Sequence, residues 1–211
     1  MIIAVEGVFG VGKSALVAEL AKRHGLRAVL EPVTDSPLLA AYYRDPKAYA
    51  LTFQLFVLMQ RVAQHIDASH DLRTHHLFDR SIIGDLIFAT MHIAEGNMST
   101  VEAALYLDTF RRVTEALKPP DVVVWLDAPS EMVLDRIHGR GREAEKNISL
   151  DYLEKNRRAH AQSFEGNSFN WDGTPVRVVK LLWSAFTSAE DVLTAIQANG
   201  IDLWGSAADA R

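Results

Sequence analysis

Residues 7–14 read GVFGVGKS, which matches the pattern G-x-x-x-x-G-K-[ST] at every fixed position. Backbone N–H groups of such a loop surround a β-phosphate, and the helix that follows adds positive potential at its N-terminus. Lys13 is expected to reach the β- and γ-phosphates, and the Ser14 hydroxyl to ligate Mg²⁺. The residues expected to bind the nucleotide are Gly7, Val8, Phe9, Gly10, Val11, Gly12, Lys13 and Ser14. The stretch therefore predicts a site for a nucleoside triphosphate.

The residues on either side of this loop predict a strand before it and a helix after it. MIIAVEG is a short apolar run that ends in glycine, and apolar residues recur at helical spacing after the loop until Gly25. Four further short apolar runs predict buried strands at residues 27–30, 76–78, 122–126 and 176–179. Helical patterns separate most of these runs. We therefore expect an α/β fold with a five-stranded parallel sheet flanked by helices.

Helical patterns are strongest where a capping signal precedes an apolar periodicity. Asp45 and Pro46 fit the N-cap and the first turn of a long helix. The expected helices span about residues 46–73, 82–94, 99–117, 130–139, 149–165 and 188–199. With no internal repeat or linker, residues 1–200 are expected to form one domain, and residues 201–211 a frayed tail.

Composition limits the class of protein. The 211 residues are 48% hydrophobic and 23% charged, as in ordinary globular chains, and the absence of cysteine excludes disulfides and thiolate chemistry. A net charge of -5 argues against a surface for nucleic acid or anionic lipid. No apolar run approaches the ~18 residues of a membrane span, and the first predicted strand leaves no room for a signal peptide. We expect a soluble, cytoplasmic protein.

Carboxylates follow three of the predicted strands. In parallel sheets ligands gather at the carboxyl ends of strands, where Glu31, Asp79 and Asp127 lie. Glu31 is placed to take a proton from an attacking hydroxyl. Asp79 and Asp127 compete for a metal contact, and we favour Asp79 because Arg80 follows it, whereas a helix-start pattern after Asp127 suggests a capping residue.

Two other stretches place charges in unusual surroundings. RIHGRGRE, residues 136–143, sets arginines beside glycines, which suits a mobile clamp on transferred phosphate, although a solvated basic helix end is the alternative. LTFQLFVLMQR, residues 51–61, carries Gln54 and Arg61 on one helical stripe. Asp85 is a lone acid in an apolar helix, and Arg61 could compensate its burial.

Five motifs together carry a family resemblance. They are GVFGVGKS, then EPV, then YYRDP with FQLFVLMQR, then DRSIIGD, and then RIHGRGREAE with DYLEK, in this order. In order and spacing the chain resembles the deoxynucleoside kinase family, in particular the bacterial deoxyguanosine and deoxyadenosine kinase branch, which is related to deoxycytidine kinase. The resemblance implies a P-loop kinase fold with an arginine-rich lid and a homodimer. It also implies transfer of the ATP γ-phosphoryl group to the 5′-hydroxyl of a deoxyribonucleoside with Mg²⁺.

The resemblance also implies roles for single residues. Glu31 is similar in position to the family's general base, Arg80 to the arginine beside it, and Asp79 to a Mg²⁺ partner that acts partly through water. Lys13 and the lid arginines belong to the phosphoryl-transfer machinery. The lid arginines are Arg136, Arg140 and Arg142, one of which stacks on the donor base.

The nucleoside side of the site is implied in the same way. Tyr43 and Glu145 match a pair that holds the sugar 3′-hydroxyl, and Gln54 matches the residue that bonds the base edge. Arg61 and Asp85 match a base-selecting pair that accompanies cytosine or purine substrates. The expected nucleoside-binding residues are Glu31, Tyr43, Phe53, Gln54, Val57, Arg61, Arg80, Asp85, Phe88 and Glu145.

Three functions stay open at this point. We favour a purine deoxynucleoside kinase over a deoxycytidine kinase and consider thymidine a poor substrate. A nucleoside monophosphate kinase of the thymidylate kinase type shares the phosphate loop, but EPVTDSP, residues 31–37, offers no cation for a second phosphate. A non-catalytic nucleotide-binding subunit would be free to lose Lys13, Ser14, Glu31 and Arg80, which are all present.

Overall fold

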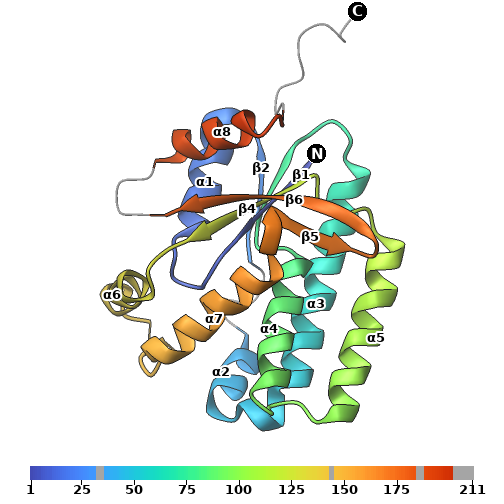
Figure 1. The fold of residues 1–211 in the computed structure, drawn as a ribbon, viewed down its shortest axis with the longest axis vertical. Coiled ribbons are helices and arrows are strands. Elements are labelled where there is room, and N and C mark those ends of the chain that lie inside the picture. Colours follow the sequence, from blue (N-terminus) through green and yellow to red (C-terminus); the bar gives the residue numbers. More distant parts are fainter. Residues whose placement is uncertain (32–35, 143–144, 184–187, 202–211) are drawn as a thin grey trace, which may run out of the picture.

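A six-stranded sheet organises the computed structural model, which describes residues 1–31, 36–142, 145–183 and 188–201 (Figure 1). The strand order is β2-β3-β1-β4-β6-β5. The strands are β1 Ile2–Glu6, β2 Arg27–Val29, β3 His76–Asp79, β4 Val122–Asp127, β5 Ser168–Trp171 and β6 Thr174–Leu182. All neighbours pair in parallel except β5, which pairs antiparallel with β6.

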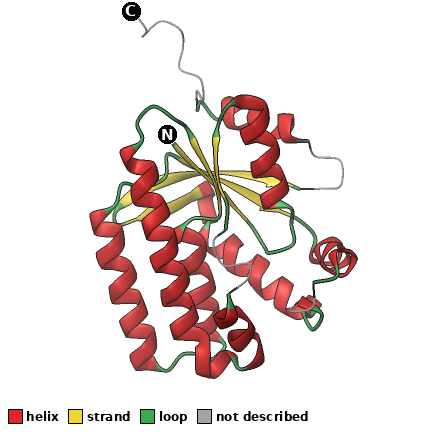
Figure 2. Cartoon of the chain, turned by 180° about the vertical axis from the view of Figure 1, so that it is seen from behind, coloured by secondary structure: helices red, strands yellow, loops and turns green. Residues whose placement is uncertain are grey.

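Helices cover both faces of the sheet, as the view from behind also shows (Figure 2). The helices are α1 Lys13–His24, α2 Pro37–Arg44, α3 Pro46–His70, α4 Ile82–Ala94, α5 Thr100–Ala116, α6 Ser130–Arg140, α7 Leu150–Ser163 and α8 Ala189–Ala198. A short 3-10 helix, Glu165–Asn167, precedes β5. Helices α1 and α8 cover one face, α3, α4 and α5 cover the other, and α7 packs against α4 and α6 (Figure 1).

The alternation of side chains along β4 explains this layering. Val122, Val124 and Leu126 join the core beneath α1 and α8, whereas Val123 and Trp125 join the core beneath α4 and α5. Successive side chains of a strand point to opposite faces, so a central strand needs apolar residues at every position. All of β4 is buried, including its last residue, Asp127. The run VVVWL thus identified a central strand.

The expected α/β fold is confirmed, and its strand count needs one correction. The five expected strands form the parallel part of the sheet, and β5 adds a sixth, antiparallel strand at the edge. Asp172 and Gly173 connect β5 to β6, and both have positive φ, 45° and 82°. An Asp-Gly pair between two strands is a signal for a tight hairpin. That signal could have located β5, whose own residues, SFNW, are too mixed to stand out.

Helix α2 was also missed by the sequence analysis, and most of the other helix boundaries agree closely. Ser36 caps α2 by accepting a bond from the N–H of Leu38, and Pro37 occupies its first turn. Asp45 caps α3 as expected, but α3 ends at His70, not residue 73. Gly25 ends α1 in the left-handed region. Of the expected tail, residues 202–211 lie outside the described residues, and the single domain over residues 1–200 stays a prediction.

No helix in the described parts of the chain is both long enough and apolar enough to cross a membrane.

The edge strand provides a test of how the fold holds together. The Trp171 indole N–H donates to the carbonyls of Thr114 and Leu117, both at 3.2 Å, which ties β5 to the end of α5. We expect Trp171→Phe to lower the free energy of unfolding by about 1–3 kcal/mol because buried carbonyls lose their donor. Urea denaturation followed by circular dichroism would measure this.

Tyr106→Phe is the matched control for that variant. The Tyr106 hydroxyl is buried and has no hydrogen-bond partner among the described residues, so its removal should change stability by no more than about 0.5 kcal/mol. Equal losses in the two variants would contradict the role of the Trp171 hydrogen bonds.

Candidate active site

The loop between β1 and α1 needs glycine for steric reasons. Gly7 has φ 143°, and a Cβ there would lie 2.6 Å from the Leu126 carbonyl oxygen of β4. Gly10 has φ 80°, and a Cβ there would lie 2.5 Å from the Ile137 side chain of α6. The loop therefore runs in close contact with its neighbours. This close packing holds the loop backbone at the start of α1, and helix N-termini are sites that bind phosphate.

Lys13 points back toward this loop. Its Nζ donates to the carbonyl oxygens of Gly7 at 3.1 Å and Val8 at 2.9 Å. Burial lowers the pKa of Lys13 to about 7, and Arg80 adds to the effect, while Asp79, Glu31 and Glu6 oppose it. An amine with such a pKa regains its charge when an anion arrives. The loop is thus prepared to receive a phosphate.

Two side chains donate hydrogen bonds to the backbone of the phosphate loop. The Val11 carbonyl oxygen accepts a bond from Arg136 Nη1 at 2.8 Å and another from Trp183 Nε1 at 3.0 Å. Arg136 was expected to contact the nucleotide, and the structure places it against the loop backbone instead of in the cavity. Trp183 was not anticipated at all. Its position just after β6 gave no sequence signal of a contact with a residue 172 positions earlier.

The structure separates the two aspartates that competed for a metal. Ser14 Oγ donates to Asp79 Oδ2 at 2.5 Å, and Asp79 Oδ1 is buried without a partner among the described residues. Asp127 instead accepts from Arg157 Nε at 2.6 Å and lies 2.9 Å from Lys180 Nζ. Asp127 therefore carries a structural ion pair. It is not the capping residue of α6 either, because the N-cap there is Pro129.

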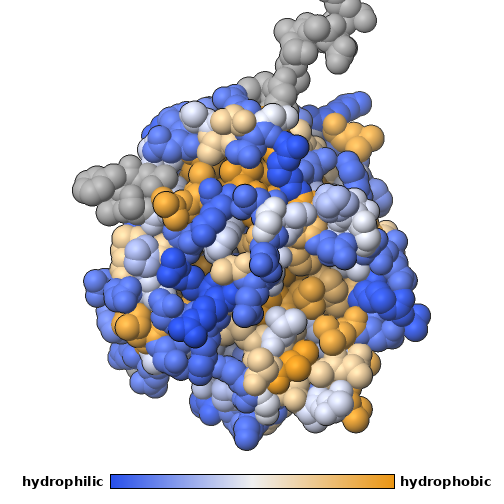
Figure 3. All heavy atoms as spheres, in the orientation of Figure 1, coloured by the Kyte–Doolittle hydropathy of each residue, from blue (hydrophilic) through white to orange (hydrophobic). Residues whose placement is uncertain are grey.

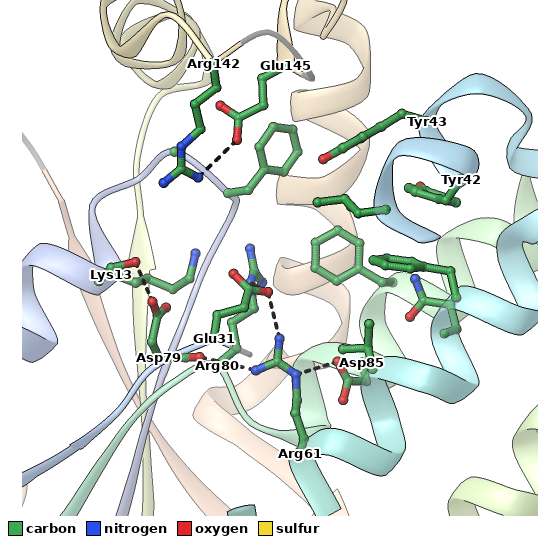
Figure 4. A pocket seen from close by; sticks show the side chains of 18 of the residues that line it. Lys13, Glu31, Tyr42, Tyr43, Arg61, Asp79, Arg80, Asp85, Arg142 and Glu145 are labelled. Atoms are coloured by element: carbon green, nitrogen blue, oxygen red, sulfur yellow. Dashed lines mark hydrogen bonds and ion pairs between the residues drawn. The ribbon is translucent and has the colours of Figure 1, made fainter. Parts of the chain in front are cut away.

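A cavity of about 360 Å³ joins the loop to the helices below it (Figure 4). Expected site residues that line it are Phe9, Gly10, Gly12, Lys13, Ser14, Glu31, Tyr43, Phe53, Gln54, Val57, Arg61, Asp79, Arg80, Asp85, Phe88, Arg140, Arg142 and Glu145. The cavity is not lined by four residues that were expected to bind the nucleotide, namely Gly7, Val8, Val11 and Arg136. One continuous cavity thus collects residues from five separate motifs.

Four lining residues were missed by the sequence analysis, namely Ala15, Leu39, Tyr42 and Tyr152. Leu39 and Tyr42 lie on α2, and their spacing with Tyr43 is the three- and four-residue step of one helix face. Recognising α2 would have revealed them. Tyr42 stacks on Phe53 with ring centroids 4.8 Å apart, and its hydroxyl lies 2.9 Å from His92 Nε2. These contacts make a rigid aromatic wall.

A buried guanidinium links the two ends of the cavity. Arg61 is 2% exposed, and its Nη2 donates to Glu31 Oε1 while its Nε donates to Asp85 Oδ1, both at 2.8 Å (Figure 4). Its Nη1 also donates to the Asp79 carbonyl at 3.3 Å. The expected pairing of Arg61 with Asp85 is therefore present in the structure, and the bond to Glu31 was not anticipated.

The charged side chains joined by Arg61 shift one another's pKa values. Burial works to raise the pKa of Glu31, but Arg61, Arg80 and Lys13 outweigh it and hold that pKa below its usual range. Burial raises the pKa of the Asp85 carboxyl, and the Arg61 guanidinium works in the opposite direction. Glu31 is consequently ionised at neutral pH, the state in which a carboxylate can accept a proton.

Arg80 lies beside Glu31 in a strained backbone position. Its φ is 68°, which is uncommon for a residue with a side chain. Its Nε is 3.6 Å from Glu31 Oε1, and its guanidinium carbon lies 4.8 Å from the centre of the Phe88 ring. Its two terminal nitrogens are buried and have no hydrogen-bond partner among the described residues. These donors are available to an anion in the cavity.

Two of the three lid arginines lie close to the same acid, Glu145. Arg140 Nη2 lies 2.5 Å from Glu145 Oε2, and Arg142 Nη1 lies 3.5 Å from Glu145 Oε1. Figure 4 shows Arg142 and Glu145 above the loop and Tyr43 facing the same space. Residues 143 and 144 lie outside the described residues. The lid thus brings two cations and a carboxylate to the mouth of the cavity.

Comparison with known proteins agrees with this geometry. A family model described as deoxynucleoside kinase matches residues 3–199. The chain belongs to the deoxynucleoside kinase family. It is therefore an ATP-dependent phosphotransferase, and this membership favours the first of the three functions left open by the sequence.

Curated members of the deoxynucleoside kinase family cover most of the chain. The deoxyadenosine kinase of Dictyostelium discoideum is 30% identical over 196 residues, which cover 93% of this chain and 78% of the relative. The deoxyadenosine/deoxycytidine kinase of Bacillus subtilis (strain 168) is 37% identical over 157 residues, or 73% of this chain and 72% of the relative.

A solved deoxynucleoside kinase shares the fold. The deoxyadenosine kinase from M. mycoides, with products dCMP and a flexible dCDP bound, superposes with a TM-score of 0.79 at 27% identity. The match covers 95% of this chain and all of that chain, 100%. The P-loop kinase fold expected from the motifs is thereby confirmed.

The pKa of Lys13 predicts how this kinase responds to pH. Because its pKa is lowered to about 7, Lys13 is charged below that pH in the free enzyme and loses its charge as the pH rises. We expect kcat/KM for ATP to fall on the alkaline side of about pH 7, while kcat, measured with ATP bound, falls only at higher pH. Steady-state kinetics between about pH 5.5 and 9 would measure both.

Lys13→Arg is the control, because a guanidinium stays charged over this range. Its residual activity should lack the alkaline fall in kcat/KM. A wild-type profile that stays flat to about pH 9 would contradict the assignment of that fall to Lys13.

Proposed function

We propose that this kinase transfers the γ-phosphoryl group of ATP to the 5′-hydroxyl of a purine deoxyribonucleoside, with deoxycytidine as a second substrate and thymidine as a poor one. The observation that carries the proposal is the Glu31–Arg61–Asp85 chain, which connects the phosphate end of the cavity to the base end. A nucleoside fits between these ends with its 5′-hydroxyl toward Glu31. The base then faces Gln54, Arg61 and Asp85, which line the same cavity.

Glu31 is proposed as the general base. It is ionised at neutral pH, lies near the loop that receives the phosphates, and is the carboxylate nearest to Arg80 Nε in the cavity. Its Oε1 accepts from Arg61, so its other oxygen is the one that can take the 5′-hydroxyl proton. Proton removal makes the hydroxyl oxygen a better nucleophile toward the γ-phosphorus.

Cations around the loop are proposed to stabilise the transferred phosphoryl group. Lys13 sits beneath the loop, Arg80 has two terminal nitrogens with no hydrogen-bond partner among the described residues, and Arg140 and Arg142 approach from the lid. Positive groups on several sides suit a transition state whose charge spreads over three equatorial oxygens. Positioning and electrostatic stabilisation supply most of the rate enhancement in phosphoryl transfer.

Mg²⁺ is proposed to bind with ATP beside Ser14 and Asp79. The donor set fits a hard cation, because a hydroxyl and a carboxylate lie 2.5 Å apart and Asp79 Oδ1 is a buried acceptor without a partner in the described chain. When bound, the ion would neutralise charge on the β- and γ-phosphates. Turnover that persists in EDTA would contradict this assignment.

The preference for bases other than thymine follows from hydrogen bonding. Asp85 Oδ2 is buried and has no partner among the described residues, so it needs a donor from the base. Adenine, guanine and cytosine carry an exocyclic amino group, and thymine carries none. The names of the relatives, deoxyadenosine kinase and deoxyadenosine/deoxycytidine kinase, support the same selection.

We further infer that two copies of the chain associate. Apolar side chains on α5 are exposed, with Val101 at 79% and Leu105 at 51%, and α3 adds Phe56 and Met59. Figure 3 shows apolar surface on the side where α4 and α5 lie. Monomeric proteins rarely leave such patches uncovered. Sedimentation at micromolar concentration tests the dimer, and a single species of monomer mass would argue against it.

Glu31→Gln tests the general base. The amide cannot take a proton, so we expect kcat to fall by about 10²–10⁴-fold while ATP affinity stays unchanged. Isothermal calorimetry with ATP and steady-state rates with deoxyadenosine measure the two effects. Glu19→Gln is the control, because Glu19 is an exposed acid on α1. A kcat near the wild-type value in Glu31→Gln would contradict the role of Glu31 as general base.

Base selection is tested with the double variant Arg61→Met with Asp85→Ala. Removing both charges leaves neither unpaired, and the kcat/KM for thymidine relative to deoxyadenosine should rise by at least about tenfold. The assay is a panel of the four deoxyribonucleosides and their monophosphates with Mg-ATP. If the relative kcat/KM for thymidine does not rise, the argument that Arg61 and Asp85 select the base is wrong. A preference for the monophosphates would instead identify a monophosphate kinase.

A further inference from the structure

Glu6 is a buried acid that the proposed reaction does not use. It ends β1, immediately before the phosphate loop, and its side chain is fully buried at 0% exposure. It does not line the cavity described above. A carboxylate in such a place is costly unless hydrogen bonds and opposite charges compensate it. The groups that contact Glu6 therefore indicate its role.

One oxygen of Glu6 holds the turn between β3 and α4. Oε1 accepts from the backbone N–H of Ser81 at 2.7 Å, from Ser81 Oγ at 2.8 Å and from the N–H of Gly84 at 3.3 Å. Two of these donors are backbone N–H groups at the start of α4, where the helix favours negative charge, and the Gly84 N–H also donates to the Ser81 carbonyl at 3.0 Å. Ser81 Oγ also caps α4 by accepting from the N–H of Ile83.

The other oxygen of Glu6 fits against a glycine. A Cβ added to Gly84 would lie 2.7 Å from Glu6 Oε2, a distance that real contacts do not reach. Gly84 is in the first turn of α4, where its helix propensity is about 1 kcal/mol worse than that of alanine. Glycine at this position therefore fits the close approach of the carboxylate.

The turn that Glu6 holds carries Arg80. The Arg80 N–H donates to the Val5 carbonyl at 3.0 Å, and the next N–H, of Ser81, donates to Glu6. These two bonds clamp both sides of a residue whose φ is 68°. Such strain persists only where the surroundings enforce it. Glu6 Oε2 also lies 3.9 Å from Arg80 Nη1.

Glu6 also adds negative charge beneath a group of cations. Lys13, Arg61 and Arg80 are all buried around the cavity, and Asp79, Asp85 and Glu31 are the acids that face them. Without Glu6 these buried cations would repel one another with less compensation.

We propose that Glu6 is a positioning residue for phosphoryl transfer. Its carboxylate fixes the turn that aims Arg80 at the cavity, holds the first turn of α4 against β1, and balances the cations around the loop. The inference rests on the proposed role of Arg80. It adds a residue outside the cavity to the machinery, and it explains the glycine at position 84.

Glu6→Gln tests the proposal, because it keeps the shape of the side chain and removes its charge. We expect kcat with deoxyadenosine to fall by about 10- to 100-fold, as happens when an outer partner of a functional group is lost. The KM for deoxyadenosine should change by less than about threefold, because Glu6 does not reach the base end.

Gly84→Ala is the second variant, and it tests the geometry alone. Its methyl group displaces the carboxylate but keeps the charge, so kcat should fall while the KM for deoxyadenosine changes by less than about threefold. The gain in helix propensity offsets part of the clash, which favours folding. If Glu6→Gln does not fold, a wild-type kcat in Gly84→Ala overturns the proposal.

Asp127→Asn is the matched control, since Asp127 is also a buried acid at the end of a parallel strand. It should lower the melting temperature and leave kcat unchanged. The proposal is overturned if Glu6→Gln keeps wild-type kcat, or if Asp127→Asn reproduces its kinetic changes. A wild-type enzyme that phosphorylates no deoxyribonucleoside would refute the proposed function instead, whatever the variants do.

Discussion

Parallel pairing of β1 with β3 is the constraint on which the site depends. Val5 of β1 lies opposite Asp79 of β3, and β4 pairs with the other side of β1. Because the three strands run in the same direction, the chain leaves all of them at one edge of the sheet. The phosphate loop and Asp79 therefore meet there, and Ser14 can bond to Asp79. A slip of one residue would turn every side chain of a strand to the opposite face.

Buried charge is the second organising feature of this edge. Arg61 stays protonated in a protein, so its burial requires acceptors, and Glu31, Asp85 and the Asp79 carbonyl provide them. Some buried atoms have no hydrogen-bond partner within the described chain, among them Asp79 Oδ1, Asp85 Oδ2 and the Nη atoms of Arg80. Unsatisfied buried groups are costly, which is why we interpret them as positions for metal, base and phosphate.

Local patterns and tertiary packing differ in how well they could be anticipated. The strand ends and most helix boundaries follow from short-range periodicity and capping, as Asp45 and Gly25 illustrate. Strand β5 was overlooked because its four residues lack a clear period, although the Asp-Gly turn after it was visible. Helix α2 was overlooked because it is only eight residues long, and Tyr42 was lost with it.

The sequence by itself determined the phosphate loop, the parallel α/β architecture and the stripe of Gln54 and Arg61, because each depends on residues close together in the chain. Only the tertiary structure decided which aspartate lies beside Ser14, and that Arg136 supports the loop from behind. It alone revealed that Arg61 reaches Glu31 as well as Asp85. These contacts join residues tens of positions apart, so strand register and helix packing, not local pattern, set their distances.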